Sequence, residues 1–480
     1  MWQIGAPPFK HVDAIRRIDM NKLKPLHNLP FTLTTLLLLM GIPLVQASNF
    51  VRPGGAAEIE EVAAGYVALF TCSAHFVMGR KLDDILAEEL VDLKSMELPP
   101  PNIDAQRFLV TAQDHSGRTA VAAYRPSLGC SVLPPDWQTG DVARLPSISL
   151  PDTPDLADTP FPDGDQARPR PNRAQRDLLE SALDGNSFGE GTHTVGVIVI
   201  KDGNMVAERY RPGFGIHTGY RTWSTAKSIT ATLIGIAQRD GLLQVDDPAN
   251  IPEWQYFDDP RQAITIRHLL QMSSGLQSYG ANTNAIYFGG QDAISAATGM
   301  PLEGEPGAVW KYANNDTLLL LRSLRATLDD DLRYLRYPYD ELFRRIGMYH
   351  TRMETDHQGN FIGSSQVYTT ARDLARFGLL YLNDGMWSGQ RILPEGWSSF
   401  VAESAPALPR EDGKQGYGAQ FWLLDRLAGV PPGTYTTAGN KGQFVTIVPT
   451  HSMVIVRTGI DPNGKRWDQG KFVAEAVTLF

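Results

Sequence analysis

The chain has 480 residues, of which 42% are hydrophobic and 20% charged, and this composition predicts a globular protein with a large core. Its length alone indicates about two to four domains. The formal net charge is −9 and no basic run appears, so the chain lacks the positive face that a nucleic-acid partner needs.

The first 47 residues comprise an N-terminal extension over 1–19 and a stretch from Met20 that has the pattern of a secretory signal peptide. Lys22 and Lys24 precede an apolar stretch over 31–45, and Val45-Gln46-Ala47 places small or short residues at a cleavage site. A transmembrane anchor fits less well, because it needs about 20 apolar residues. We therefore set 1–47 apart from the fold and expect a periplasmic or secreted mature protein without a stable membrane anchor.

Two cysteines, Cys72 and Cys130, follow this segment. In an oxidising compartment an even pair favours a disulfide that closes a loop of about 58 residues, and two buried free thiols are the alternative. Neither cysteine has a second Cys or a His at metal-ligand spacing, and the sequence contains no His-Glu-x-x-His run. We predict no metal site and no cofactor.

Residues 48–170 are predicted to form a small α+β module with a proline-rich connection. Apolar residues recur at helical spacing over 59–93, and partial alternation over 107–124 around a turn predicts a hairpin. Prolines then recur over 134–171 with little periodicity, which indicates an ordered wrap or a linker. We assign this module no chemistry.

The remaining chain, 171–480, is predicted to be one domain with strands at both ends and helices between them. The expected elements are a helix over 177–183, a hairpin of strands over 195–200 and 205–210, a helix from 225 that ends at Gly241, a mainly helical region over 242–383, strands over 444–449 and 453–457, and a helix over 472–480.

The chain contains a single Ser-x-x-Lys, at Ser224 and Lys227, where the central helix is expected to begin. Positions three apart share a helix face, so the serine Oγ and the lysine Nζ can meet. A lysine accepts the serine proton only if its pKa is lowered, and burial together with the positive field of a helix N-terminus lowers it. The pair therefore indicates a nucleophile and its general base.

Two further motifs follow in order, Tyr312-Ala313-Asn314 and Asn440-Lys441-Gly442. Ser-x-x-Lys, Tyr-x-Asn and a Lys/His-x-Gly-type triplet form the three-part pattern of penicillin-recognising serine hydrolases. The segments HLLQMSSGL over 268–276 and TARDLARFG over 370–378 are also similar to that group. From about Asp177 to Phe480 the chain resembles the serine β-lactamase-like superfamily, in the branch of class C β-lactamases, family VIII-type esterases, D-aminopeptidases and 6-aminohexanoate-dimer hydrolases.

This resemblance implies an α+β fold of the β-lactamase/transpeptidase type. We expect an antiparallel sheet flanked by helices, an inserted mostly α domain, and a cleft between them, preceded by the module over 48–170.

The resemblance also implies roles for single residues. Ser224 is the nucleophile, Lys227 its general base, and Tyr312 the second proton-transfer group, whose phenol ionises more easily near two cations. Asn314 positions Lys227 or the substrate amide. Trp223, Tyr279 and Trp422 are candidates to line the pocket, although aromatic residues more often belong to the core.

The oxyanion hole implied by the resemblance combines the backbone N–H of Ser224 with that of Gln443, and Gly442 keeps the strand clear of side chains. Asn440 stands where β-lactamases and DD-peptidases have a lysine that helps to hold the substrate carboxylate. Because side chains alternate along a strand, we expect Lys441 to point away from the face of Asn440, and a bulged strand that turns Lys441 into the cleft is the alternative.

Other polar residues near these motifs have structural interpretations. We expect Asp373 to take part in a helix cap with Thr370, Asn315 and Asp316 to cap a helix, and His268 to be structural.

The sequence thus predicts an exported serine hydrolase that cleaves a small-molecule ester or amide through an acyl-enzyme. A β-lactamase or DD-peptidase, and a non-catalytic relative that only binds a ligand, are the alternatives. The presence of Ser224, Lys227 and Tyr312 together argues against the non-catalytic relative, because a binding module does not need this proton-transfer set.

Overall fold

The computed structural model describes residues 59–278, 284 and 286–480. The predicted signal peptide over 1–47 and the candidate pocket residue Tyr279 lie outside these residues. These described residues belong to one compact unit, so the segment before the hydrolase region packs together with it. Within the described residues, none of the helices combines the length and the apolar character that a membrane span requires.

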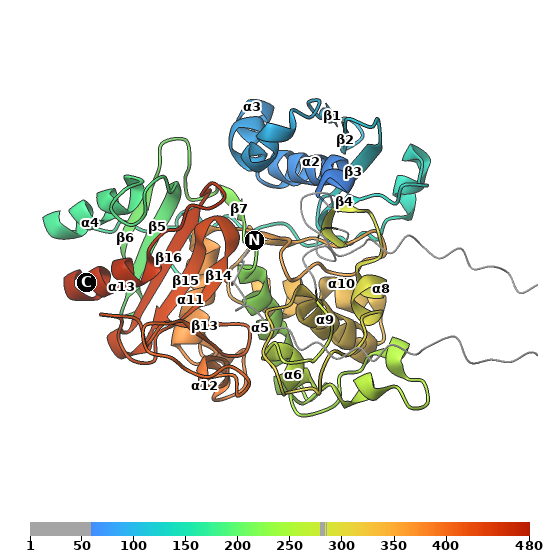
Figure 1. Ribbon diagram of the computed structural model, residues 1–480. Helices are drawn as coiled ribbons and strands as arrows, with labels where there is room; N and C mark the ends of the chain where they lie inside the picture. The colour runs from blue at the N-terminus through green and yellow to red at the C-terminus, as the bar shows by residue number, and fades with distance from the viewer. Residues whose placement is uncertain (1–58, 279–283, 285) are drawn as a thin grey trace, which may run out of the picture. The chain divides into compact units, whose positions relative to one another are not determined.

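A seven-stranded antiparallel sheet forms the main layer (Figure 1). Strands from the beginning and the end of 171–480 pair side by side in it, as predicted, in the order β12-β13-β14-β15-β16-β5-β6. The bounds are β5 Thr194–Lys201, β6 Asn204–Tyr210, β12 Gly416–Tyr417, β13 Trp422–Leu423, β14 Tyr435–Gly439, β15 Gln443–Val448 and β16 Met453–Gly459.

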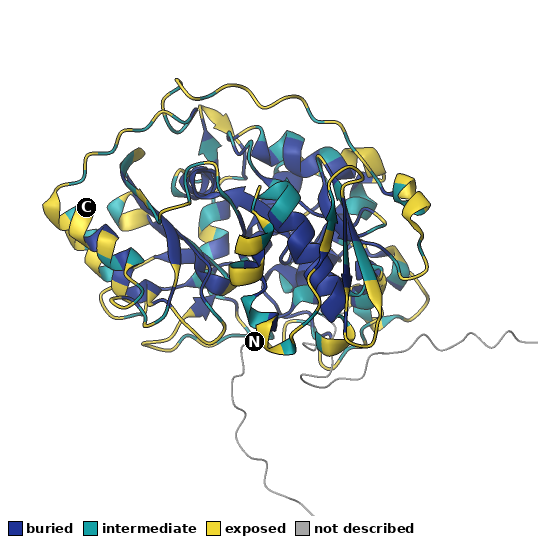
Figure 2. Ribbon diagram, turned by 90° about the horizontal axis from the view of Figure 1, so that it is seen from above, coloured by how far each residue is buried: buried dark blue, intermediate teal, exposed yellow. Residues whose placement is uncertain are grey.

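Helices cover both faces of this sheet, and strand β5 is apolar on both faces for that reason. Val197 and Val199 belong to the core cluster formed with α4 (Arg173–Leu183) and α13 (Gln469–Leu479). Ile198 and Ile200 belong to the larger cluster on the other side, which includes α5 (Thr225–Arg239) and α11 (Ala371–Leu382). The buried centre and the exposed outer face of the terminal helix are visible in Figure 2.

The mainly helical region predicted over 242–383 is confirmed. A small sheet of order β7-β9-β8 connects this region with the start of α5. The elements are β7 Gly219–Arg221, α6 Ile266–Leu270, α8 Ala293–Thr298, α9 Asn314–Leu328, α10 Asp331–Tyr337, β8 Arg352–Met353 and β9 Val367–Thr370, followed by β10 Met386–Trp387, β11 Gln390–Arg391 and α12 Trp397–Ala402.

The N-terminal module, residues 59–132, packs one helix on a four-stranded antiparallel sheet. The predicted hairpin is present as β2 and β3, and the one or two helices expected over 59–93 are one longer α-helix followed by several short helical segments. The bounds are α2 Ala63–Cys72, η1 Ser73–Val77, α3 Leu82–Asp84, η2 Ile85–Glu89, η3 Val91–Met96, β1 Asn102–Asp104, β2 Leu109–Gln113, β3 Thr119–Arg125 and β4 Gly129–Val132.

The proline-rich connection is an ordered wrap, because arginine side chains bind its backbone carbonyls. Arg336 donates to Ser149 O at 2.7 Å, and Arg376 donates to Pro162 O at 2.8 Å and to Gly164 O at 2.7 Å. Backbone carbonyl groups outside helices and strands need hydrogen-bond donors of this kind when they are buried away from water.

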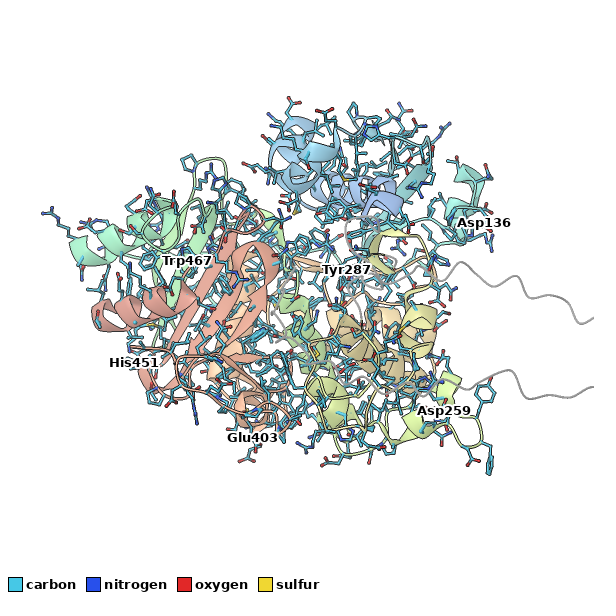
Figure 3. All side chains as sticks on the ribbon, in the orientation of Figure 1. Asp136, Asp259, Tyr287, Glu403, His451 and Trp467 are labelled. Atoms are coloured by element: carbon cyan, nitrogen blue, oxygen red, sulfur yellow. A yellow bond between two sulfur atoms is a disulfide. The ribbon has the colours of Figure 1, made fainter. Side chains whose placement is uncertain are left out.

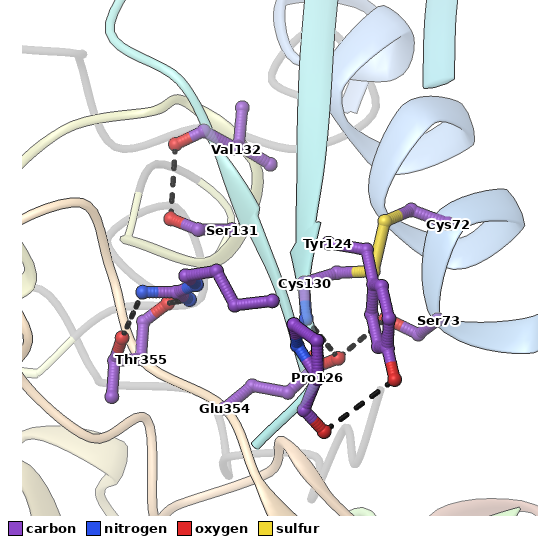
Figure 4. The surroundings of a disulfide bond; sticks show 10 residues. Cys72, Ser73, Tyr124, Pro126, Cys130, Ser131, Val132, Glu354 and Thr355 are labelled. Atoms are coloured by element: carbon purple, nitrogen blue, oxygen red, sulfur yellow. Dashed lines mark hydrogen bonds between the residues drawn. A yellow bond between two sulfur atoms is a disulfide. The ribbon is translucent and has the colours of Figure 1, made fainter. Parts of the chain in front are cut away.

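Cys72 and Cys130 form the predicted disulfide, which joins the end of α2 to β4 (Figure 4). We expect replacement of both cysteines by alanine to lower the free energy of unfolding by about 2–4 kcal/mol, because the bridge restricts the unfolded chain. Denaturant unfolding of the wild type and the double variant measures this loss, with reduced wild type as the control. Two thiols that react with an alkylating reagent without reductant would contradict the bridge.

Candidate active site

Ser224 lies at the start of the buried helix α5, directly after a strained residue. The preceding Trp223 has φ of +50°, a left-handed conformation that a bulky side chain rarely adopts. Ser224 itself is the N-cap residue of α5 and is half-buried. The nucleophile candidate therefore lies at the positive end of a helix, where free N–H groups can face a developing oxyanion.

Lys227, one helical turn later, is buried with 1% of its surface exposed. Its Nζ lies 3.4 Å from Ser224 Oγ, 2.5 Å from Asn314 Oδ1 and 2.8 Å from the carbonyl oxygen of Ser364. Burial lowers the pKa of Lys227 to about 7. Because the unprotonated amine is then well populated at neutral pH, this lysine can accept a proton from Ser224.

Ser364 is a contact that the sequence analysis missed. Its Oγ lies 2.6 Å from the hydroxyl of Tyr287, a buried side chain near the middle of the molecule (Figure 3). No local motif marks either residue, since Ser364 lies in a loop before β9 and its role arises from packing against α5. Asn314 is predicted to position either Lys227 or the substrate amide, and the structure places its side chain beside Lys227.

Tyr312 lies beside the same lysine, with Lys227 Nζ 5.1 Å from the centre of its ring. Burial raises the pKa of Tyr312 well above its usual value, and a hydrogen bond with Ser224 offsets only part of this shift. The expectation that this phenol ionises easily is therefore wrong, because the cost of burying its anion dominates. A neutral phenol beside Ser224 and Lys227 can donate or relay a proton.

Aromatic side chains from three segments surround Tyr312. Trp422 lies 5.6 Å from it and Tyr417 5.9 Å, measured between ring centres, and Trp310 lies 6.4 Å away. This cluster presents apolar ring surface next to the candidate nucleophile and base.

The third motif has a different conformation from the one predicted. Asn440–Gly442 form a turn between β14 and β15, and Lys441 has φ of +57°, so the alternation of a strand does not apply to them. The Gly439-Asn440-Lys441-Gly442 sequence is itself a turn signal, which would have indicated this conformation. The Nζ of Lys441 lies 2.6 Å from Asp92 Oδ2 of the N-terminal module, in a pair that is nearly buried.

Gly442 also has other surroundings than those predicted, whereas the role of the Gln443 N–H stays a prediction. A Cβ at Gly442 would lie 1.4 Å from Arg457 Nη1, so the absence of a side chain there makes room for a buried arginine and not for a cleft. The Gln443 side chain binds the backbone of Gly459, and the backbone carbonyl oxygen of Gln443 accepts a hydrogen bond from Thr225 Oγ1 at 3.2 Å.

Strand β14 meets the nucleophile segment at two points that the sequence analysis did not single out. The Oγ1 atoms of Thr437 and Thr225 lie 3.0 Å apart. A Cβ at Gly439 would lie 2.1 Å from the carbonyl oxygen of Thr222, so only glycine permits this approach of the two backbones.

The structural interpretation of Asp373 and His268 is confirmed, and the helix cap predicted for Asn315 and Asp316 is wrong, because α9 begins at Asn314 and both residues lie inside it. The N–H of Asp373 donates to the capping Thr370 side chain at the start of α11, and His268 takes part in the capping box of α6. Helix α9 has no side-chain cap; Asp316 is fully buried, accepts a hydrogen bond from Ser274 at 2.8 Å, and has a pKa raised to about 7 by burial.

One group of side chains in the described part of the chain is arranged so that it could hold a metal ion. Possible ligand atoms of Asp165, His217 and His350 all lie within 4.8 Å of one another. Asp165 Oδ1 already accepts a hydrogen bond from Arg376 at 2.8 Å. These residues come from three distant segments, so motif spacing does not reveal the group.

Comparisons with known proteins show which family the chain is similar to. The family model described as Beta-lactamase matches residues 176–464. The 6-aminohexanoate-dimer hydrolase of Paenarthrobacter ureafaciens is 24% identical over 340 residues, which cover 63% of this chain and 82% of that protein.

Two solved structures share the fold at low identity. A protein of Bacteroides dorei assigned as a beta-lactamase is 18% identical with a TM-score of 0.52, covering 64% of this chain and 98% of that one. EstCE1, a hydrolase with promiscuous acyltransferase activity, is 15% identical with a TM-score of 0.50, covering 64% and 98%.

Proposed function

Since the chain belongs to the beta-lactamase family of serine hydrolases, we propose that it cleaves a small-molecule ester or amide through an acyl-enzyme on Ser224. The contact between Ser224 and the buried Lys227 carries this proposal, because it joins a nucleophile at a helix N-terminus to a base whose pKa is about 7.

In the proposed reaction the neutral amine of Lys227 takes the proton of Ser224 as Oγ attacks the substrate carbonyl. The Ser224 N–H and a second N–H from the hairpin over 439–443 stabilise the oxyanion. As the bond to the leaving alcohol or amine breaks, Tyr312 gives its proton to that group and takes up the proton that Lys227 accepted, so both residues return to their neutral forms. Water then attacks the acyl-enzyme with the same groups acting in reverse, which releases the acid and restores Ser224.

The proposal includes export of the protein. The signal-peptide pattern over 1–47 and the Cys72–Cys130 disulfide support it, because structural disulfides persist in oxidising compartments. A periplasmic or secreted location is thus the expected one.

The pH dependence of ester hydrolysis tests the proposed base. Because Lys227 acts unprotonated, we expect kcat/KM for p-nitrophenyl butyrate to be low in acid and to rise with pH through an apparent pKa near 7. Histidines also titrate in this range. The variant His268→Gln should therefore keep the same profile, and a profile that is flat between pH 5 and 9 would refute the role of Lys227.

A further inference from the structure

The N-terminal module lies against the segment that carries the nucleophile, and the matched family region begins only at residue 176. The ring of Phe70, near the end of α2, lies 5.6 Å from the ring of Trp223. Trp223 is the residue with positive φ directly before Ser224. A conformation of this kind persists only where the surrounding packing holds it.

Arg221 links the Phe70–Trp223 contact to the segment that binds Lys227. Its guanidinium lies 4.3 Å from the centre of the Phe70 ring and 4.2 Å from that of Trp223. Its Nη2 also donates to Ser365 Oγ at 2.9 Å, next to the Ser364 carbonyl that binds Lys227. One stacked group therefore touches the segments that position both Ser224 and Lys227.

A second contact from the module holds the turn over 440–442. Lys441 and Asp92 form an ion pair whose side chains are only 2% and 12% exposed. This turn follows Gly439, whose backbone approaches Thr222 closely. Movement of the turn would therefore displace the backbone on which Ser224 lies.

The module is in turn anchored to the hydrolase region beside its disulfide. Glu354 Oε1 accepts hydrogen bonds from Ser73 Oγ and from the backbone N–H of Cys130, both at 2.8 Å (Figure 4). Ser73 follows Cys72 and lies three residues after Phe70, so this anchor holds the end of α2 that bears the stacking ring.

From these contacts we infer that Phe70 and Asp92 are positioning residues for the nucleophile, and that the module over 59–132 is a working part of the active site. This inference rests on the proposed function. Phe70 acts through Trp223, and Asp92 acts through Lys441 and the turn over 440–442. Neither needs to touch the substrate.

The test compares Phe70→Leu with Phe76→Leu, which removes a ring that packs on Phe108 and Tyr124 within the same module. We expect Phe70→Leu to lower kcat for p-nitrophenyl butyrate on the order of 10- to 100-fold and to change KM less than about twofold, because a small misplacement of a nucleophile slows the chemistry. Phe70→Tyr, which keeps the ring, should have a kcat close to that of the wild type. Phe76→Leu should also leave kcat unchanged.

Asp92→Asn provides a second arm, with Asp141→Asn as its control because Asp141 pairs with Arg144 in the connection that follows the module. We expect Asp92→Asn to slow labelling of Ser224 by a fluorophosphonate and Asp141→Asn to leave the labelling rate unchanged. Equal kcat and equal labelling rates in wild type, Phe70→Leu and Asp92→Asn would overturn the inference and leave the proposed function intact. A wild type that neither hydrolyses the ester nor reacts with the fluorophosphonate would overturn both.

Discussion

Replacement of Ser224 by alanine is expected to abolish both ester hydrolysis and labelling by a fluorophosphonate. The reason is that Ser224 Oγ is the atom that forms the acyl bond in the proposed reaction. Lys227→Met should keep the apolar stem of the side chain and lower kcat/KM by about 10²- to 10⁴-fold, because it removes the proton acceptor 3.4 Å from that atom.

Ser228→Ala is the matched control for Ser224→Ala. Ser228 lies on the same helix and donates to the carbonyl of Gln420 at 2.6 Å, away from Lys227. The control variant should retain labelling and turnover, and circular dichroism of each variant verifies folding. Turnover that persists in Ser224→Ala, once contamination by wild type is excluded, would disprove the acyl-enzyme.

The second large effect concerns the choice of substrate. We expect kcat/KM for p-nitrophenyl butyrate to exceed that for nitrocefin, and D-Ala-D-Ala carboxypeptidase activity to be weak or absent. Nitrocefin carries a carboxylate, and the nearby cation Lys441 is already paired with Asp92 at 2.6 Å. A charge-assisted hydrogen bond missing from the site is worth about 1.5–3 kcal/mol, or one to two decades in specificity.

Asn440→Lys tests this explanation. It adds to the turn a second ammonium group for the substrate carboxylate, whereas the ammonium group of Lys441 is paired with Asp92. We expect the variant to improve nitrocefin hydrolysis relative to that of the butyrate ester. The double variant Asn440→Lys/Lys414→Asn also removes an exposed lysine that pairs with Glu411, so it keeps the net charge of the wild type and controls for the added charge. Nitrocefin as the better substrate of the wild type would contradict the expected preference for neutral esters or uncharged amides.

The sequence by itself predicted what short-range geometry controls. Ser224 and Lys227 are three residues apart, so the helix alone brings them to one face. The hairpin of β5 and β6 follows from apolar runs around Lys201–Asn204, whose turn residues favour one local conformation. The roles of the three motifs came from their order along the chain and from the resemblance, since no local rule predicts that Tyr312 lies beside Lys227.

Only the tertiary structure decided the pKa values and the contacts of those groups. The low pKa of Lys227 and the high pKa of Tyr312 arise from burial, which depends on segments distant in the chain. Lys441 pairs with Asp92 because packing of the N-terminal module brings together residues about 350 positions apart, and local periodicity contains no information on such contacts. The same packing places Phe70 against Trp223, so a module without a recognisable motif reaches the nucleophile.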